Sequence, residues 1–331
     1  CRQKPPDYHM TASLWQDRAR LFRAVRSFFQ EDDYIEVDTP ILVTAPGCEV
    51  HLDYFATQWV DFRGADHQRF LRSSPELHMK QVLASGEPRI FQLAKSFRNR
   101  GERSHWHHPE FTMLEWYTVG QTFEQMIEQT LQLVTAAAEV FGQKLHGDSC
   151  LRVTVAEAFQ EFAGISLQDG DPHLASKGLA AGAHSCGEDD DFETAFFKIL
   201  LEKIEPQLQR AELAIVTDYP ASQAALAKIE GGVAKRFELY WRGVELCNGF
   251  DELLDGEANR QRFADVIKRR QQLEMTQHQV DLEFLQAVGS GLPACCGNAL
   301  GLDRLLALVR GHTSLQDSVP FWRQWPSSSS R

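Results

Sequence analysis

The stretch SFRNRGERSHWHHPEFTMLEWY, which runs from Ser96 to Tyr117, decides the fold. Apolar residues just before Arg98 predict one strand, and the run from Thr112 to Trp116 predicts a second. The polar loop between them is rich in arginine and histidine. Because guanidinium donors bind phosphate oxygens two at a time, a strand pair joined by such a loop suits a polyphosphate ligand.

The bulk composition is that of a globular enzyme. The chain has 331 residues, of which 43% are hydrophobic and 24% charged, and this length suits one large catalytic unit. A formal net charge of -12 argues against a surface built to hold nucleic acid, so tRNA is not favoured as a partner. Seven cysteines without a CxxC pair indicate neither a disulfide framework nor a zinc ribbon, which favours a reducing, cytoplasmic location. No membrane-spanning run or signal peptide is visible, so we expect no membrane partner.

The pattern along the chain predicts an α+β fold in which helices flank one mixed, mainly antiparallel sheet. A helical stripe begins near Leu14, and Thr122 with Gln125 and Thr154 with Glu157 have capping-box spacing. A hairpin turn is expected at 242–243, between two apolar runs. We predict a single domain over residues 1–331, with a surface insertion at 164–191 and a disordered tail at 327–331.

Two features of the opening stretch can carry chemistry. Arg98 ends an apolar strand, and the ring of Phe111 at the other end of the loop could stack on a base, although core packing explains a phenylalanine equally well. His105, His107 and His108 are dense enough to raise the possibility of a metal site, but no cysteine or HExxH motif accompanies them. Donation to phosphate oxygens is the favoured interpretation, and a merely polar loop tip is the alternative.

Glu245 and Glu252 form a second candidate site within VELCNGFDEL. Carboxylates on an apolar strand are costly to bury unless cations compensate them. A separation of seven places them on opposite faces of a regular strand, so we expect a bulge at Asn248-Gly249 to bring both toward one Mg²⁺ ion bound to phosphates. The alternative is an edge strand with a solvated acidic face.

Two further groups complete the candidate site. Gly301-x-Asp303-Arg304 places an arginine at a helix start, and Arg98 with Arg304 would hold the two ends of an ATP molecule. Glu76, Glu115 and Tyr117 lie in segments where no lysine is expected to compensate the acids. A pocket of that kind predicts a cationic ligand, such as the ammonium groups of an amino acid.

Together these segments resemble the catalytic core of class II aminoacyl-tRNA synthetases of the lysyl type. Tyr34–Pro40 resembles motif 1 of that family, Phe97–Glu115 motif 2 and Gly301–Arg304 motif 3. SPELHMK, HPEFTMLEWY and ELCNGFDEL are similar to signatures of the lysyl subgroup. The resemblance covers most of the chain, and its motif 1 implies a homodimer.

The chain resembles more closely the stand-alone paralogues that attach (R)-β-lysine to elongation factor P. The motif 1 helix begins by about Leu14, which implies no anticodon-binding domain, and PASQAAL at Pro220 to Leu226 is similar to that subgroup. Ala299 stands where lysyl synthetases have glycine. The resemblance implies an ATP-dependent ligase that activates (R)-β-lysine or lysine as an acyl-adenylate and transfers it to a lysine side chain of elongation factor P. The alternatives are a truncated lysyl-tRNA synthetase that charges tRNA, and a non-catalytic regulatory paralogue that binds an amino acid.

Carried over residue by residue, the resemblance implies roles for three sets of residues. Arg98 and Arg304 are the implied catalytic residues, and Glu245 and Glu252 the implied ligands of Mg²⁺. The implied ATP-binding residues are Arg98, Asn99, Arg100, Glu102, His107, His108, Phe111, Glu245, Leu246, Gly301 and Arg304. The implied substrate-binding residues are Ser74, Pro75, Glu76, Glu115, Tyr117, Asn248, Glu252 and Ala299.

Overall fold

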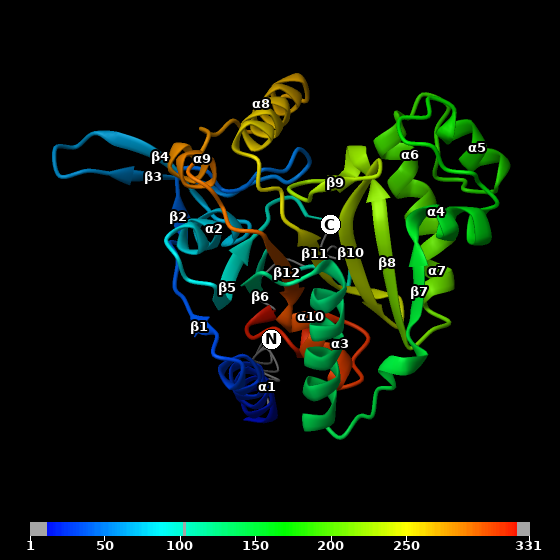
Figure 1. Cartoon of the computed structure of the whole chain (residues 1–331), viewed down its shortest axis with the longest axis horizontal. Coiled ribbons are helices and arrows are strands. Elements are labelled where there is room, and N and C mark those ends of the chain that lie inside the picture. Colours follow the sequence, from blue (N-terminus) through cyan, green and yellow to red (C-terminus); the bar gives the residue numbers. More distant parts are fainter. Residues whose placement is uncertain (1–11, 102–103, 323–331) are drawn as a thin grey trace, which may run out of the picture.

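The structure, a computed structural model, describes residues 12–101 and 104–322. Its centre is a nine-stranded sheet in the order β1-β5-β6-β12-β11-β10-β8-β7, with β9 paired to β10 (Figure 1). The β1–β5 and β7–β8 pairs are parallel, and the other pairs that the structure describes in this sheet are antiparallel. The predicted α+β fold with a mixed, mainly antiparallel sheet is therefore confirmed.

The strands of the central sheet are short at its edges and long at its centre. In sheet order they are β1 (Ile35–Glu36), β5 (Arg89–Phe97), β6 (Glu110–Val119), β12 (Cys295–Gly301), β11 (Val244–Asp251), β10 (Val233–Trp241), β8 (Leu213–Pro220) and β7 (Leu151–Thr154), with β9 at Ile229–Glu230. A separate three-stranded sheet contains β2 (Leu42–Val43), β4 (Asp66–Leu71) and β3 (Ala56–Val60) in that order.

Ten α-helices surround the sheets in the described part of the chain. They are α1 (Ala12–Glu31), α2 (Glu76–Ala84), α3 (Phe123–Val140), α4 (Val155–Ala158), α5 (Leu174–Ala180), α6 (Phe192–Ile199), α7 (Glu205–Leu208), α8 (Gly256–Gln272), α9 (Leu282–Gly289) and α10 (Leu302–Val309). π-helical turns at Phe159–Ala163 and Leu200–Ile204 extend α4 and α6. Short 3₁₀ turns span Gly147–Ser149, Ala221–Gln223 and Leu315–Asp317.

One face of the central sheet is covered along most of its width. Helices α1, α3 and α10 pack their apolar sides against it, and Leu114 and Trp116 of β6 are fully buried beneath them. Because side chains alternate along a strand, the odd-numbered residues of β6 point to the face opposite to Leu114 and Trp116. Phe111, Met113 and Glu115 therefore point away from α3.

The opposite face is covered in two separate places. Helices α2, α8 and α9 pack over its β5–β6 side, and α4 to α7 with their π turns pack over its β8–β7 side, on the right in Figure 1. Between these two apolar clusters, the central strands present polar side chains, among them Glu115, Asn248 and Glu238. The fold thus leaves a polar strip in the middle of this face.

Local sequence signals placed several elements correctly. The hairpin turn between β10 and β11 has positive φ at Arg242 and Gly243, as a two-residue hairpin loop requires. Both capping boxes are present, at Thr122 before α3 and Thr154 before α4. The segment 164–191, for which the composition predicts a surface insertion, contains α5 and contributes buried residues to the cluster under α6. The tail at 327–331 lies outside the described residues.

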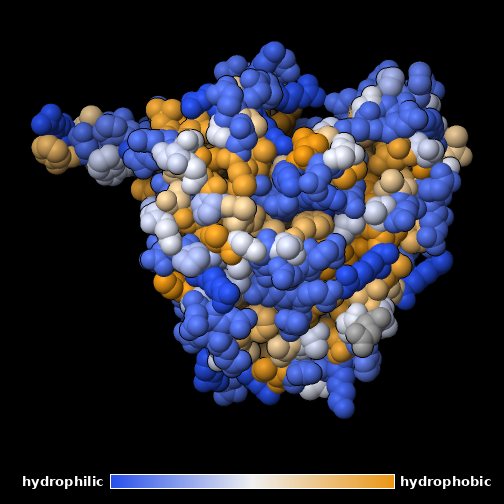
Figure 2. All heavy atoms as spheres, in the orientation of Figure 1, coloured by the Kyte–Doolittle hydropathy of each residue, from blue (hydrophilic) through white to orange (hydrophobic). Residues whose placement is uncertain are grey.

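The β3–β4 hairpin projects from the body of the molecule (Figure 1, and at the left in Figure 2). Every residue of β3 is exposed, and Phe62 near the tip is 92% exposed. Figure 2 shows hydrophilic and hydrophobic residues mixed along this arm. Across residues 12–101 and 104–322, no helix combines the length and apolarity needed to cross a membrane.

Candidate active site

The strand register brings most of the predicted site residues to one face of the sheet. Across neighbouring strands, Glu115 of β6 pairs with Ala299 of β12, which pairs with Asn248 of β11. At the end of this face, β12 finishes at Gly301 opposite Met113, and α10 begins immediately afterwards. The site therefore extends from an acidic pocket near the middle of the sheet to a cationic edge where β5, β12 and the motif 2 loop end.

Arg304 is the centre of the cationic edge. Its guanidinium donates to the backbone oxygen of Glu245 at 2.7 Å, lies 3.3 Å from the Glu245 carboxylate and lies 2.9 Å from Nε2 of His107. A further bond to the backbone oxygen of Trp106 at 3.2 Å ties α10 to the motif 2 loop. The structure thus brings together three residues that the sequence predicts as ATP ligands.

Arg98 lies at the same edge, just after β5 ends. Its guanidinium carbon is 5.3 Å from the centre of the Phe111 ring, so the two predicted ligands are in contact. Among the residues that the structure describes, no hydrogen-bond partner reaches the buried Nε of Arg98. A buried guanidinium donor without a partner fits an anionic ligand, because burying such a donor without a hydrogen bond is costly.

Other residues of the motif 2 loop turn outward or lie beyond the described part. The side chain of Arg100 is 84% exposed and pairs with Asp53 at 3.3 Å, and the backbone of Asn99 bonds to the oxygen of Asp53. Glu102 lies outside the described residues. The ring of His108 is buried against Trp322 at 4.9 Å, and its Nδ1 lies 2.5 Å from the backbone oxygen of Glu110, so its contact with ATP stays a prediction.

The bulge in β11 is present but lies nearer the strand's start than predicted. Leu239 of β10 pairs with Cys247, whereas the next residue, Tyr240, pairs with Glu245. The extra residue is therefore Leu246 rather than one at Asn248-Gly249. The side chain of Leu246 is buried in the core under α3, so only its backbone is available to a nucleotide. Gly301 is the N-cap of α10 and lies against the stem of Arg304.

The acidic pocket is built around Glu115. Ser74 donates its hydroxyl to one oxygen of Glu115 at 2.6 Å, and Tyr117 donates to the other at 3.2 Å. Burial, followed by the charge of nearby Glu76, raises the pKa of Glu115 to about 8. The Ser74 hydroxyl also accepts from the backbone N–H of Glu76, and Pro75 is the N-cap of α2. This part of the predicted substrate site is assembled in the fold.

The expectation that no lysine compensates these acids is wrong. Lys80 of α2 is 2% exposed, and its Nζ lies 2.6 Å from Oε1 of Glu76 and 2.6 Å from Oε2 of Glu252. The ammonium of Lys80 also lies over the aromatic ring of Tyr117, with its Nζ 5.9 Å from the centre of the ring. Burial lowers the pKa of Lys80, but the two carboxylates outweigh burial, and the pKa is raised. The i,i+4 spacing of Glu76 and Lys80 within SPELHMK is the signal that could have revealed this pair.

The prediction that Glu245 and Glu252 share a metal ion is also wrong. Seven residues at about 3.3 Å each place their Cα atoms roughly 20 Å apart along β11. Glu252 lies beyond the strand's far end, where it is 1% exposed and paired with Lys80. It therefore belongs to the acidic pocket, while Glu245 belongs to the cationic edge.

Glu238 is a site residue that sequence reasoning missed. It lies on β10 two residues before Tyr240, the residue that pairs with Glu245, so Glu238 and Glu245 are diagonal neighbours on adjacent strands. The Cβ atoms of such neighbours are about 7–8 Å apart or less. Its carboxylate accepts from Tyr240 at 2.6 Å and from Arg236 at 2.5 Å, and Arg236 also donates to Asn248. The sequence did contain a signal for Glu238. It alternates with two apolar residues, Phe237 and Leu239, whose side chains are buried in the core on the other face of the sheet.

These two glutamates, rather than Glu245 and Glu252, fit a divalent cation bound jointly with phosphates. Mg²⁺ is usually held by one or two carboxylates together with phosphate oxygens and water. Within residues 12–101 and 104–322, no three His, Cys, Asp or Glu side chains converge as an all-protein metal site would require. The donor set therefore suits a cation that arrives with a polyphosphate.

A buried ion pair fixes the backbone beneath the cationic edge. Arg18 of α1 pairs with Asp303 at 2.5 Å and donates to Thr112 at 3.1 Å. The other oxygen of Asp303 accepts from the backbone N–H of Thr112 at 2.7 Å. Because Asp303 precedes Arg304 and Thr112 follows Phe111, this network holds motif 2 and motif 3 in one arrangement.

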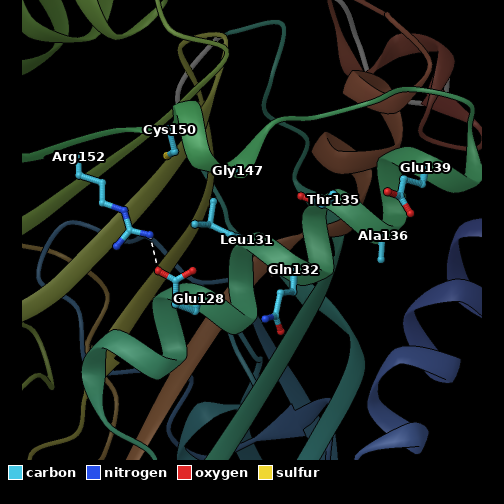
Figure 3. A pocket seen from close by; sticks show the side chains of 9 residues that line it. All are labelled: Glu128, Leu131, Gln132, Thr135, Ala136, Glu139, Gly147, Cys150 and Arg152. Carbon is cyan, nitrogen blue, oxygen red and sulfur yellow. Dashed lines mark hydrogen bonds and ion pairs between the residues drawn. The ribbon is translucent and has the colours of Figure 1, made fainter.

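A pocket elsewhere on the surface contains none of the predicted site residues. It lies between α3 and the segment Gly147–Arg152, where Arg152 and Glu128 form an ion pair (Figure 3). Since α3 covers the face of the sheet opposite to Glu115, this pocket is separate from the acidic pocket. It is open to solvent along the outer side of the helix.

Comparison with known proteins agrees with the geometry. The profile of tRNA synthetases class II (D, K and N) matches residues 9–324. The chain is 37% identical to an elongation factor P–(R)-β-lysine ligase of Vibrio cholerae over 96% of its own length and 98% of the relative's. Relatives of the same name from Vibrio atlanticus and Yersinia enterocolitica are each 36% identical, over 94% and 92% of this chain and 96% and 93% of their own. The chain belongs to the class II tRNA synthetase family of the D, K and N type.

Proposed function

We propose that this enzyme activates (R)-β-lysine, or lysine, with ATP and transfers the acyl group to a lysine side chain of elongation factor P. The observation that carries the proposal is the layout of one sheet face, with Arg98, Arg304 and Glu245 at its edge and a buried acidic pocket next to it. The names of its relatives supply the acceptor and the isomer.

The first half-reaction follows from this layout. A diamino acid places its ammonium groups among Glu76, Glu115 and Glu252, so that its carboxylate points along the sheet toward the cationic edge. That carboxylate attacks the α-phosphorus of ATP, and pyrophosphate leaves. Arg98 stabilises the charge that builds on the α-phosphoryl oxygens, and Arg304 with His107 holds the outer phosphates.

Mg²⁺ would be held by Glu245 and Glu238, and it would neutralise phosphate charge when bound. Phe111 offers a ring face for the adenine base. No side chain of the enzyme needs to act as a nucleophile, because the attacking groups come from the two substrates. In the second half-reaction, the ε-amine of a lysine on the protein partner attacks the acyl carbon of the acyl-adenylate; the bond to the phosphate oxygen breaks, AMP leaves, and the amine loses a proton as the amide forms.

We also propose that the enzyme is a homodimer, that its acceptor is a protein, and that it works in the cytoplasm. The segment that resembles motif 1 and the two residues that follow it leave Ile35, Ile41 and Leu42 between 43% and 48% exposed, which suits a homodimer interface. The net charge of -12 supports a protein acceptor over tRNA. Because the reaction uses ATP to modify a translation factor, we place it in the cytoplasm.

Mass spectrometry of purified elongation factor P tests the proposal directly. The factor is incubated with the enzyme, ATP, Mg²⁺ and each lysine isomer, and a parallel reaction offers tRNA as the acceptor. A mass increase of one lysyl group on the factor is expected. Labelling of tRNA with an unmodified factor would instead identify a tRNA-charging synthetase, and ATP binding without exchange or transfer would identify a non-catalytic paralogue.

A further inference from the structure

Lys80 is an almost completely enclosed cation beside the acidic pocket. It lies on the inner side of α2, is 2% exposed, and contacts carboxylates from two separate elements. Glu76 begins α2, whereas Glu252 follows β11 and bonds through its backbone N–H to the oxygen of Cys295. The ion pairs therefore connect the helix that forms one wall of the pocket to the end of the strand that forms the other.

The charges that surround Lys80 are unevenly distributed. The titratable groups that face it are Glu76, Glu115, Glu252, Tyr117, Cys48 and Cys295. Three of these are carboxylates, and Lys80 is the cation that touches two of them. Three carboxylates and one lysine leave a net charge of two negative charges around the pocket. A diamino acid carries two ammonium groups, so it would balance this charge. Because burial raises the pKa of Glu115 to about 8, this carboxyl must give up its proton when a substrate ammonium binds beside it.

The geometry also limits where a substrate cation can bind. Lys80 fills the space between Glu76 and Glu252, so a substrate ammonium cannot enter between them and must approach from the side of Glu115 and Ser74. Without Lys80, the buried carboxylate of Glu252 and the partly buried carboxylate of Glu76 would face each other with no cation, and one would be protonated or displaced. The gap would also admit the long amine of the substrate in a wrong position.

We propose that Lys80 is a positioning residue that sets the charge and the shape of the substrate pocket, fixing Glu76 and Glu252 so that the pocket accepts an amino acid with two ammonium groups. The inference rests on the proposed function, because it takes the acidic pocket as the amino-acid site. It adds an internal counter-ion to the residues that determine substrate specificity.

The test is a double-mutant cycle with Lys80→Met and Glu252→Gln, measured by ATP–pyrophosphate exchange as a function of (R)-β-lysine concentration. Lys80→Met is expected to raise KM for (R)-β-lysine at least tenfold, while kcat at saturation stays within about threefold because Arg98, Phe111 and Arg304 are untouched. In the Glu252→Gln background the same change is expected to raise KM less than threefold, since the more deeply buried of the two carboxylates that Lys80 balances has been removed.

Two outcomes would overturn the proposal. One is a KM for Lys80→Met within twofold of the wild-type value, and the other is the same rise in both backgrounds. If Lys80→Met fails to fold, the comparison of the double variant with Glu252→Gln still decides, because the double variant no longer contains the fully buried carboxylate of Glu252, and the other partner, Glu76, is 24% exposed to solvent. In that comparison, a rise of tenfold or more would contradict the inference.

A matched control separates a pocket effect from the loss of any lysine. Lys177 also forms a 2.6 Å ion pair, with Asp171, but it is 43% exposed on α5. Lys177→Met is therefore expected to leave KM and kcat unchanged. The wild-type enzyme tests the proposed function by itself, which fails if no lysine isomer supports pyrophosphate exchange. The role of Lys80 is tested separately, by the ratio of KM values between active variants.

Discussion

Arg304 contacts Glu245 twice, through the backbone oxygen at 2.7 Å and through the carboxylate at 3.3 Å. This pair joins the first turn of α10 to the start of β11, two segments separated by some sixty residues. The side chain of Arg304 is 18% exposed and that of Glu245 is 40% exposed, so a ligand can reach the carboxylate while the guanidinium stays oriented.

Glu245→Gln is expected to raise the Mg²⁺ concentration needed for half-maximal pyrophosphate exchange at least tenfold. The amide keeps the size of the side chain but removes the charge that a magnesium ion and Arg304 both require. Titration of exchange activity with MgCl₂ measures the effect. Glu212→Gln, at a surface pair with Arg242, serves as the control. An unchanged magnesium requirement would remove Glu245 from the metal site.

Arg98→Ala is expected to reduce pyrophosphate exchange by about a hundred- to a thousandfold, the range found when one preorganised donor to a transition-state charge is removed. The fold should remain intact, as judged by circular dichroism. Arg89→Ala is the control, because Arg89 begins the same strand at its opposite end and bonds to the backbone of Asp32. Normal exchange in Arg98→Ala would show that the α-phosphate is held elsewhere.

The carboxyl of Glu115 predicts a dependence of stability on pH. Its pKa is raised to about 8 in the folded protein, above the value of about 4.3 expected when unfolded. The folded state therefore holds a proton that the unfolded state lacks between these values, and stability falls as pH rises from about 4.5 to 8. Glu115→Gln should remove this loss, so that its melting temperature exceeds that of the wild type above pH 8.

The same variant should bind the diamino acid poorly, because the amide cannot offer a charge to an ammonium group. Melting curves from pH 5 to 9, with and without (R)-β-lysine, measure both effects. A wild-type and a Glu115→Gln protein with parallel pH profiles would show that Glu115 is ionised throughout this range.

The buried pair between Arg18 and Asp303 predicts a large loss of stability on mutation. Arg18→Met leaves Asp303 buried without its cation, which typically costs about 3–5 kcal/mol. Urea denaturation measures the change. Arg310 pairs with Asp17 at 3.1 Å, but it is 43% exposed, so Arg310→Met should cost less than about 1 kcal/mol. An equal loss of unfolding free energy in the two variants would contradict the burial of the pair between Arg18 and Asp303.

Ala299→Gly is expected to shift the preference between lysine isomers toward α-lysine. Ala299 pairs with Glu115 and Asn248, so its methyl group lies on the floor of the pocket between them. Removing the methyl enlarges the space near the reacting end of the substrate. The ratio of kcat/KM values for the two isomers in pyrophosphate exchange measures the shift, and an unchanged ratio would exclude Ala299 as a selectivity determinant.

Local patterns predicted the elements well because their causes are local. The strands on each side of the motif 2 loop follow from apolar runs, and the helix starts at Thr122 and Thr154 follow from capping boxes. The hairpin at Arg242-Gly243 follows from the residues that tolerate positive φ. None of these inferences required knowledge of distant contacts.

The errors concern charges whose partners are far away in the sequence. A separation of seven residues gave no information about which end of β11 faces the phosphates, so Glu252 was grouped with Glu245 instead of with Lys80. Glu238 was overlooked because its role depends on the diagonal pairing of β10 with β11. The burial of His108 was not predicted because its neighbour, Trp322, lies more than two hundred residues further along.

Gly297 has no side chain, and a Cβ at this position would collide with the ring of Tyr117 and the carboxylate of Glu252. The missing group lets the Tyr117 ring and the Glu252 carboxylate lie directly against the backbone of β12. Homologues can be expected to vary at neighbouring positions while this one stays bare, since even the smallest replacement would push an aromatic ring and an acid out of the places they hold beside Lys80.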